Sequence, residues 1–274
     1  MTVWLNGTLL ADADARVSVF DHGLTVGDGV FETIKISGGV PFALTRHLDR
    51  LLVSAAGLGL PEPDLDLLRS GVPDLLAAAG RPPRARLRIT VTGGASPLGS
   101  ARGNEPATMI MALGEWPAID TACDVTMVPW PRNEHGALAG LKTTSYAENV
   151  IALSYARERG GAEAIFANLA GNLCEGTGTS VFVVSGGRLV TPPLSSGCLA
   201  GVTRGLVLEW AGAVEEDLPA GALAAAPEAF LTSTTRDVQP IRSVDGRPLP
   251  AVPGPVTRRA AGIFAAMSAA QSDP

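Results

Sequence analysis

Apolar and polar residues alternate along several short stretches of the chain, which is the pattern of half-buried β-strands. In the clearest of them, Ala85–Thr92, leucine, isoleucine and valine share one face and arginines share the other. Elsewhere apolar residues recur every three to four positions, which indicates amphipathic helices, as at Arg46–Ala56. Because both patterns occur along the 274 residues, the sequence predicts an α+β fold.

Turn and cap residues separate these stretches. Asn6-Gly7 and Ser37-Gly38-Gly39 are typical of tight hairpin turns, and the hydroxyl of Thr45 can accept a backbone N–H at the start of a helix. The predicted strands are Val3–Leu5, Thr8–Ala11, Val30–Ile36, Val40–Leu44, Ala85–Thr92, Thr108–Leu113, Asp124–Val128, Ala164–Asn168, Ser180–Val184, Arg188–Thr191, Ala229–Thr232 and Val238–Ile241. The predicted helices are Arg46–Ala56, Asp64–Ala79, Tyr146–Arg159, Gly201–Ala211 and Val256–Ala269.

The predicted domain junction is the sequence Glu115-Trp116-Pro117-Ala118, which follows the first group of strands. We therefore expect a small N-terminal domain over residues 1–115, a linker over residues 116–122 and a larger domain over residues 123–274. No internal repeat and no low-complexity segment interrupts this organisation.

Charge and composition exclude several classes of function. The net charge is −6 and no basic run occurs, so neither nucleic acid nor an anionic membrane is an expected partner. No apolar run reaches the roughly 18–20 residues that span a bilayer, and Met1–Ala15 lacks the basic residues of a signal peptide. The few cysteines and histidines are widely spaced, which predicts no metal site and free thiols in a reducing cytoplasm: Cys123, Cys174, Cys198, His22, His47 and His135.

Lysine is almost absent from the chain. Of 21 basic residues only Lys35 and Lys142 are lysines, and the others are arginines. A lysine that persists where arginine is otherwise used is a candidate for chemistry that only an amine can perform.

Six segments, in their order and spacing, resemble the class IV, fold type IV aminotransferases that depend on pyridoxal 5'-phosphate (PLP). That family includes D-amino-acid transaminases, branched-chain aminotransferases, (R)-amine transaminases and aminodeoxychorismate lyase. The segments are DHGLTVGDGVFET (Asp21–Thr33), TRHLDRL (Thr45–Leu51), LKTTSY (Leu141–Tyr146), NLCEGTGTS (Asn172–Ser180), LAGVTR (Leu199–Arg204) and TSTT (Thr232–Thr235). The resemblance implies a small N-terminal α/β domain, a larger β-barrel-like α+β domain and a homodimer.

The resemblance assigns the covalent chemistry to Lys142. In the family this lysine forms a Schiff base with the cofactor and then moves the substrate's α-proton, which requires an amine. Glu175 falls where a carboxylate faces the pyridine nitrogen and keeps it protonated. Ser180 replaces the asparagine that the family has near this carboxylate, so the hydrogen bonds there are expected to differ.

The resemblance also implies a set of phosphate contacts. Arg50 stands where an arginine reaches the phosphate, and its forked guanidinium suits that task. Val202 and Thr203 follow Gly201 at a predicted helix start, whose backbone N–H groups attract anions. Thr234 adds a hydroxyl at a strand end.

The residues that set the substrate depart from the D-amino-acid transaminase pattern. Those enzymes hold the substrate carboxylate with a tyrosine and an arginine–histidine pair, and the matching positions here are Phe31, Leu98 and Ser100. Another cation must then bind a carboxylate, and the candidates are Arg88 on a strand and Arg102 in the long loop.

We therefore expect a cytoplasmic aminotransferase that moves an amino group from a D-amino acid, and also from (R)-amines, to a 2-oxo acid. The alternative is 4-amino-4-deoxychorismate lyase, because the stretch Phe31–Lys35 and the lysine segment also resemble that branch. A branched-chain aminotransferase and a non-catalytic PLP-binding module are less favoured alternatives.

Overall fold

The computed structural model describes residues 2–274, which form two compact units. The first contains residues 2–117, Leu141–Tyr146 and Ser272–Pro274, and the second contains Ala118–Gly140 and Ala147–Gln271. The short lysine-containing segment thus groups with the first unit although the chain before and after it belongs to the second.

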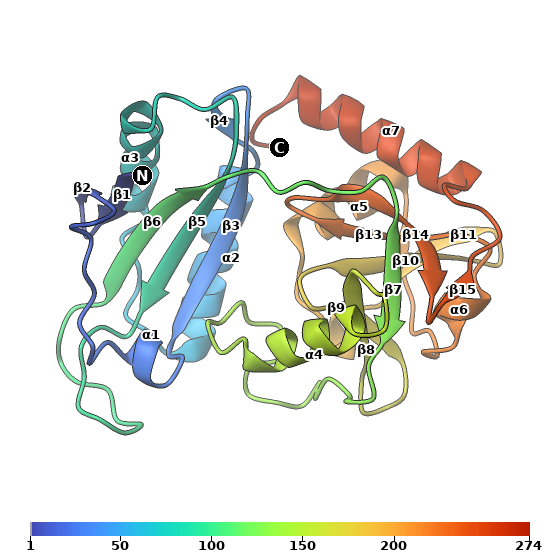
Figure 1. Ribbon diagram of the computed structural model, residues 1–274, viewed down its shortest axis with the longest axis horizontal. Helices are drawn as coiled ribbons and strands as arrows, with labels where there is room; N and C mark the ends of the chain where they lie inside the picture. Colours follow the sequence, from blue (N-terminus) through green and yellow to red (C-terminus); the bar gives the residue numbers. More distant parts are fainter. Residues whose placement is uncertain (1) are drawn as a thin grey trace. The chain divides into compact units, whose positions relative to one another are not determined.

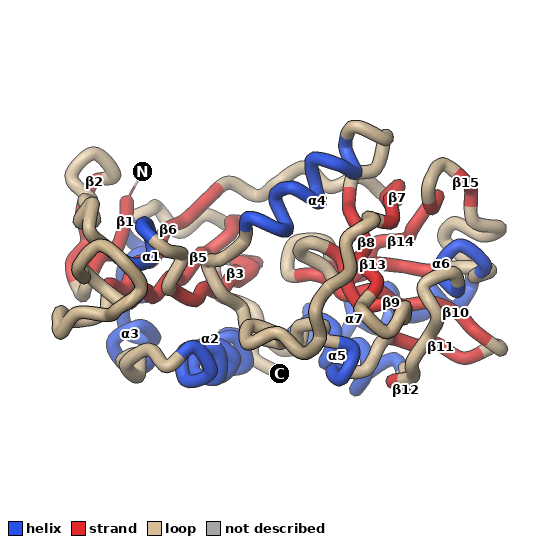
Figure 2. Tube along the Cα trace, turned by 90° about the horizontal axis from the view of Figure 1, so that it is seen from below, coloured by secondary structure: helices blue, strands red, loops and turns tan. Residues whose placement is uncertain are grey.

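An antiparallel sheet forms the centre of the first unit (Figure 1). Figure 2 shows α2 and α3 on one face of this sheet. That face is the apolar one of β5, so Leu87 and Ile89 are fully buried with Leu48 and Leu51 of α2, while the arginines of β5 face away. The strand order is β2-β1-β6-β5-β3-β4, and the elements are β1 (Thr2–Leu5), β2 (Thr8–Ala11), α1 (His22–Thr25), β3 (Gly29–Ser37), β4 (Val40–Pro41), α2 (Leu44–Leu58), α3 (Leu65–Ala78), β5 (Arg84–Thr92) and β6 (Thr108–Gly114).

The start of α2 differs from the prediction that Thr45 caps it. The helix begins at Leu44, and its N-cap residue, Ala43, has a left-handed backbone and no capping side chain. Asp273 supplies the cap, because its carboxylate accepts from the N–H of Thr45 at 2.9 Å and from its hydroxyl at 2.6 Å. The prediction of Thr45 as the cap was wrong, since a residue more than two hundred positions away makes that bond.

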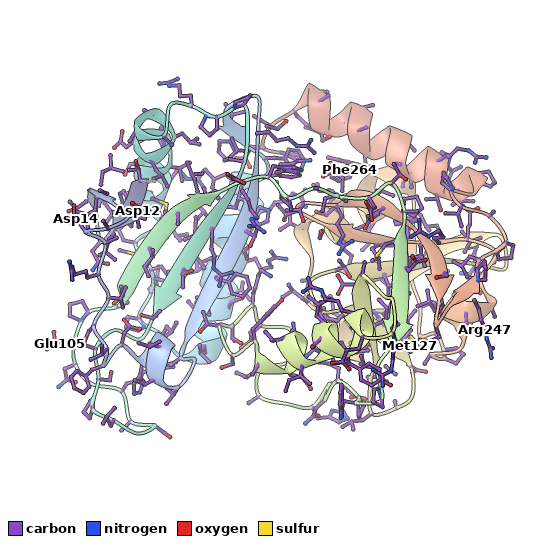
Figure 3. The ribbon with its side chains drawn as sticks, in the orientation of Figure 1. Asp12, Asp14, Glu105, Met127, Arg247 and Phe264 are labelled. Atoms are coloured by element: carbon purple, nitrogen blue, oxygen red, sulfur yellow. The ribbon has the colours of Figure 1, made fainter. Side chains whose placement is uncertain are left out.

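A mixed sheet forms the second unit, and helices α5 and α7 pack on its strands β13 and β14 (Figure 1). Phe264 of α7, labelled in Figure 3, contacts Trp210 of α5 with ring centroids 5.5 Å apart. The strand order is β12-β11-β10-β13-β14-β7-β8-β9, and β15 pairs with β14. The elements are β7 (Cys123–Met127), α4 (Ala147–Arg157), β8 (Glu163–Ala167), β9 (Leu173–Gly176), β10 (Ser180–Ser185), β11 (Arg188–Thr191), the 3₁₀ turn Leu194–Ser196, α5 (Val202–Ala211), β12 (Val214–Glu215), α6 (Ala222–Ala225), β13 (Ala229–Ser233), β14 (Asp237–Val244), β15 (Arg247–Pro248) and α7 (Pro255–Ala270).

The α+β class is confirmed, and the long predicted elements are present with ends shifted by a few residues. The predicted strand Val40–Leu44 is shortened to Val40–Pro41, because α2 already begins at Leu44. Several elements of two to four residues were missed, since so short a stretch shows no period. Among residues 2–274 no helix is both long and apolar enough to cross a membrane.

Candidate functional site

The segment Leu141–Tyr146 attaches to the start of β3 in the first unit. The N–H of Phe31 donates to the carbonyl of Lys142 at 3.0 Å, and the N–H of Thr144 donates to the carbonyl of Gly29 at 2.7 Å. The Lys142 N–H donates in turn to the hydroxyl of Ser54 on α2 at 3.1 Å. The backbone of Lys142 is therefore fixed by both a strand and a helix of the same unit.

An aromatic ring lies under the amine of Lys142. Its Nζ is 4.3 Å from the ring centroid of the buried Phe31, which meets Tyr146 edge to face at 5.2 Å. The guanidinium carbon of Arg88 is 3.8 Å from the same Phe31 centroid. The structure thus brings three predicted site residues together, Phe31, Arg88 and Lys142, and both cations face the same aromatic ring, whose face attracts positive charge.

A buried carboxylate, Glu32, fixes the predicted phosphate-binding arginine. Arg50 donates to both oxygens of Glu32, from Nε at 2.8 Å and from Nη2 at 2.7 Å, and His47 Nδ1 lies 2.7 Å from one of them. Burial alone would raise the pKa of Glu32, but the charges of Arg50 and His47 outweigh it and lower the pKa to about 2. Arg50 is thereby held in one orientation by a residue that sequence reasoning did not single out, although its place next to Phe31 in the first motif was a signal.

Lys142 lies close enough to this cluster to affect it electrostatically. Burial lowers the pKa of His47, the charge of Glu32 opposes that effect, and the charges of Arg50 and Lys142 lower the pKa further. The charges of Arg50 and Lys142 therefore both act on the His47 imidazole.

Replacement of Glu32 by glutamine should destabilise the fold at neutral pH. The pKa of Glu32 falls from 4.5 to about 2 on folding, and each unit corresponds to about 1.4 kcal/mol, so we expect a loss of about 3 kcal/mol at pH 7. Because the folded-state pKa is the lower one, this stabilisation is complete above pH 4.5 and disappears as the pH falls towards 2. Urea unfolding of the wild type and Glu32→Gln at several pH values measures the difference.

The exposed Asp49 on the same helix provides the matched control for this experiment. Asp49→Asn should change the free energy of unfolding by less than about 0.5 kcal/mol. A Glu32→Gln variant as stable as the wild type at pH 7 would contradict the buried ion-pair cluster.

Glu175 lies in β9 of the second unit and is held there by two contacts. One oxygen accepts the N–H of Leu199 at 2.9 Å, and the other lies 3.5 Å from Nε of Arg132. Arg132 stacks on Phe166 at 4.0 Å from guanidinium carbon to ring centroid and also pairs with Glu148. Glu175 is thus held in place by a backbone donor and a guanidinium, and Arg132 is a neighbour that the motifs did not reveal.

The N-terminus of α5 fits an anion. Its N-cap is Gly201, which supplies no capping side chain, and a Cβ at this position would lie 2.8 Å from the hydroxyl of Ser180. Thr232 pairs directly with Ser180 across the strands, so both side chains share that face. The Thr232 hydroxyl is buried without a hydrogen-bond partner among residues 2–274. Backbone donors, a small cradle and an unsatisfied hydroxyl together match the needs of a phosphate.

The other predicted phosphate residues lie beside this cradle. Val202 and Thr203 open α5 and are buried, while Thr234 lies half-buried in the turn after β13. Thr232 opens the TSTT segment, but within that segment the sequence analysis assigned the phosphate contact to Thr234 alone.

Arg102 is tied to the rest of the first unit, whereas Leu98 and Ser100 of the same long loop are exposed. Arg102 donates to both oxygens of Asp28, at 2.7 and 2.6 Å, and also to the carbonyls at the end of α2, Leu58 and Gly59. These bonds anchor the loop, and the role of Arg102 in substrate binding stays a prediction. Leu98 is 75% exposed, and Ser100 is exposed as well.

Comparison with known proteins gives one consistent result. Residues 29–244 match the family model described as amino-transferase class IV. The chain is 34% identical to a putative branched-chain-amino-acid aminotransferase of Methanocaldococcus jannaschii, covering 90% of this chain and 89% of that one. It is 29% identical to the D-alanine aminotransferase of Bacillus licheniformis, covering 94% of each. A crystal structure of the branched-chain aminotransferase of Thermoproteus uzoniensis with norvaline superposes with a TM-score of 0.90 at 31% identity, over 97% of this chain and 93% of that one.

Proposed function

Because the chain belongs to the class IV aminotransferases, which depend on PLP, we propose that Lys142 carries the cofactor and moves the proton during amino transfer. The observation that carries this proposal is the placement of its amine, 4.3 Å above the buried Phe31 ring and tied to β3 and α2 through its backbone. The only other lysine, Lys35, lies over Phe42 instead. An amine is the one side chain that can both condense with an aldehyde and transfer a proton.

The proposal gives the remaining site residues complementary tasks. When bound, PLP draws electrons from the substrate's α-carbon. Glu175, held by Leu199 and Arg132, keeps the proton on the cofactor's ring nitrogen. Arg50, oriented by Glu32, supplies a cation to the phosphate.

The helix start and the hydroxyls complete the proposed phosphate contacts. The first N–H groups of α5, at Val202 and Thr203, point along the helix axis towards an anion at its N-terminus. Thr232 is buried with an unsatisfied hydroxyl, and Thr234 lies in the adjoining turn.

Arg88 is the proposed partner of the substrate carboxylate. It is exposed on the sheet face that carries Lys142, and both cations contact the Phe31 ring. Phe31 and Tyr146 give the same place an apolar surface, which favours a donor with an uncharged side chain.

Arg88→Met should raise the KM for an amino-acid donor by about 10- to 100-fold, the usual cost of a lost charge-assisted hydrogen bond. The turnover number should change much less, because Arg88 would bind the carboxylate equally in the ground state and in the transition state. Steady-state kinetics with donor and 2-oxo acid varied in turn measure both constants.

Arg86, exposed on the same strand face as Arg88, is the matched control. Arg86→Met should leave the KM for the donor within about twofold of the wild-type value. Equal effects of the two substitutions would exclude a specific task for Arg88.

The similar proteins favour a branched-chain amino acid as the donor, which the sequence analysis had treated as a less favoured alternative. Most of the similar proteins named here act, by their names, on branched-chain amino acids, and the apolar surface at Phe31 and Tyr146 suits such side chains. A D-amino acid is the second candidate, supported by the similarity to a D-alanine aminotransferase along 94% of both chains.

A donor panel separates these candidates. L-leucine, D-alanine and an (R)-amine are each added to the purified enzyme, and the loss of the cofactor's visible absorption reports amino transfer. L-leucine should act fastest if the branched-chain donor is correct. Formation of p-aminobenzoate from 4-amino-4-deoxychorismate without any 2-oxo acid would instead support the lyase.

A homodimer is also part of the proposal. The segment around α1 exposes apolar side chains that a partner would cover, among them Val19 at 70% and Leu24 at 69% exposure. Light scattering that gives the molar mass of a single chain at micromolar concentration would contradict this.

A further inference from the structure

The loop that follows Glu175 is fixed by a second carboxylate. Glu163 opens β8 and accepts hydrogen bonds from the backbone N–H of Thr177 at 3.0 Å and from its hydroxyl. Asn149 of α4 donates to the carbonyl of Thr177 at 2.7 Å. The N–H, the hydroxyl and the carbonyl of Thr177 are therefore all hydrogen-bonded. Because Thr177 comes two residues after Glu175, these bonds attach the backbone that follows Glu175 to Glu163 and α4.

The same carboxylate reaches the turn that contains Thr234. Arg236 lies in this turn between β13 and β14, and its Nη2 is 3.4 Å from Glu163. Its backbone N–H donates to the hydroxyl of Ser233 at 3.2 Å, and its guanidinium also contacts Gln239 and, at 3.6 Å, the sulfur of Cys123.

We propose that Glu163 and Arg236 are positioning residues that hold the Thr234 turn and the loop after Glu175 in the arrangement that PLP requires. This inference rests on the proposed function, because it assumes that Thr234 contacts the phosphate and Glu175 the ring nitrogen. Neither Glu163 nor Arg236 is assigned a contact with the cofactor. Each acts through the segment to which it is bonded.

Burial makes this pair a strong constraint. The side chains of Glu163 and Arg236 are only 4% and 17% exposed, so removal of one charge leaves the other without its opposite charge in a poorly hydrated place. A fixed turn presents its hydroxyls without the entropic cost of ordering them on binding. Loss of the pair should therefore weaken ligand binding at this turn more than it weakens contacts made elsewhere.

The test compares two ligands that differ only in the phosphate. Dissociation constants of PLP and of pyridoxal are measured by absorption for the wild type, Arg236→Met and Arg236→Lys. We expect Arg236→Met to weaken PLP roughly tenfold, the usual effect of one lost charge-assisted hydrogen bond, and pyridoxal less than about twofold. Arg236→Lys should restore most of the PLP affinity, because a cation again faces Glu163.

Equal losses for both ligands, or no loss for either, would overturn the inference. Glu163→Gln is the second variant in case Arg236→Met does not fold, since glutamine still accepts from Thr177 but no longer attracts Arg236. It should show the same preference for weakening PLP. A wild-type protein that does not bind PLP would instead refute the proposed function, and the two failures are therefore distinguishable.

Discussion

Lys142→Ala should eliminate amino transfer. Proton transfer by a positioned side chain contributes about 10²- to 10⁴-fold to a rate, and this variant loses that step together with the covalent attachment. The half-reaction with an excess of L-leucine or D-alanine, followed by absorption under single-turnover conditions, measures the loss directly. We expect the fold to persist, because Lys142 is half-buried and its backbone hydrogen bonds to β3 and Ser54 do not involve the side chain.

Lys35 is the control for Lys142, because these two are the only lysines in the sequence. Lys35→Arg keeps a cation over Phe42 and should retain wild-type kinetics. Borohydride reduction of the wild type in the presence of PLP should label a peptide that contains position 142 and leave position 35 unmodified. A label on Lys35, or an active Lys142→Ala variant, would refute the assignment.

Glu175→Gln should lower the rate of the half-reaction by about 10²- to 10³-fold, in the range seen when a group aimed at developing charge is removed. Glutamine has nearly the same shape and still accepts from the N–H of Leu199, so the loss is one of charge. A neutral amide cannot keep the ring nitrogen protonated, and the electrons of the α-carbon are then drawn away less strongly.

Glu148 is the matched control for Glu175, because it also pairs with Arg132 but its side chain is 51% exposed. Glu148→Gln should change the half-reaction by less than about threefold, since an exposed ion pair contributes little. Rates that fall equally in the two variants would show that the loss arises from Arg132 and not from a charge at the ring nitrogen.

Local patterns were sufficient for much of the fold. The nine-residue strands β3 and β5 and the helices α2 and α7 have clear periods, so their type and approximate ends were predictable. The start of α2 was not, because its cap comes from Asp273 at the other end of the chain. Tertiary contacts of this kind leave no trace in a local window of sequence.

The same distinction applies to the candidate site. Lys142, Arg50 and Glu175 stand in recognisable motifs, whereas the contacts of Glu32 with Arg50 and of Arg132 with Glu175 join segments that are distant in the sequence. Arg102 is the opposite case, because a loop arginine looks available in the sequence, whereas in the structure it is bonded to Asp28.

The attachment of Arg102 has a practical meaning for anyone who wishes to change the range of amines this protein accepts. A directed-evolution library that randomises Leu98 and Ser100 alters side chains that project into solvent, so most of its members should express as folded protein. Inclusion of Arg102 in the same library would release the loop from Asp28 and from the end of α2, and many clones would be lost before any new specificity could be selected.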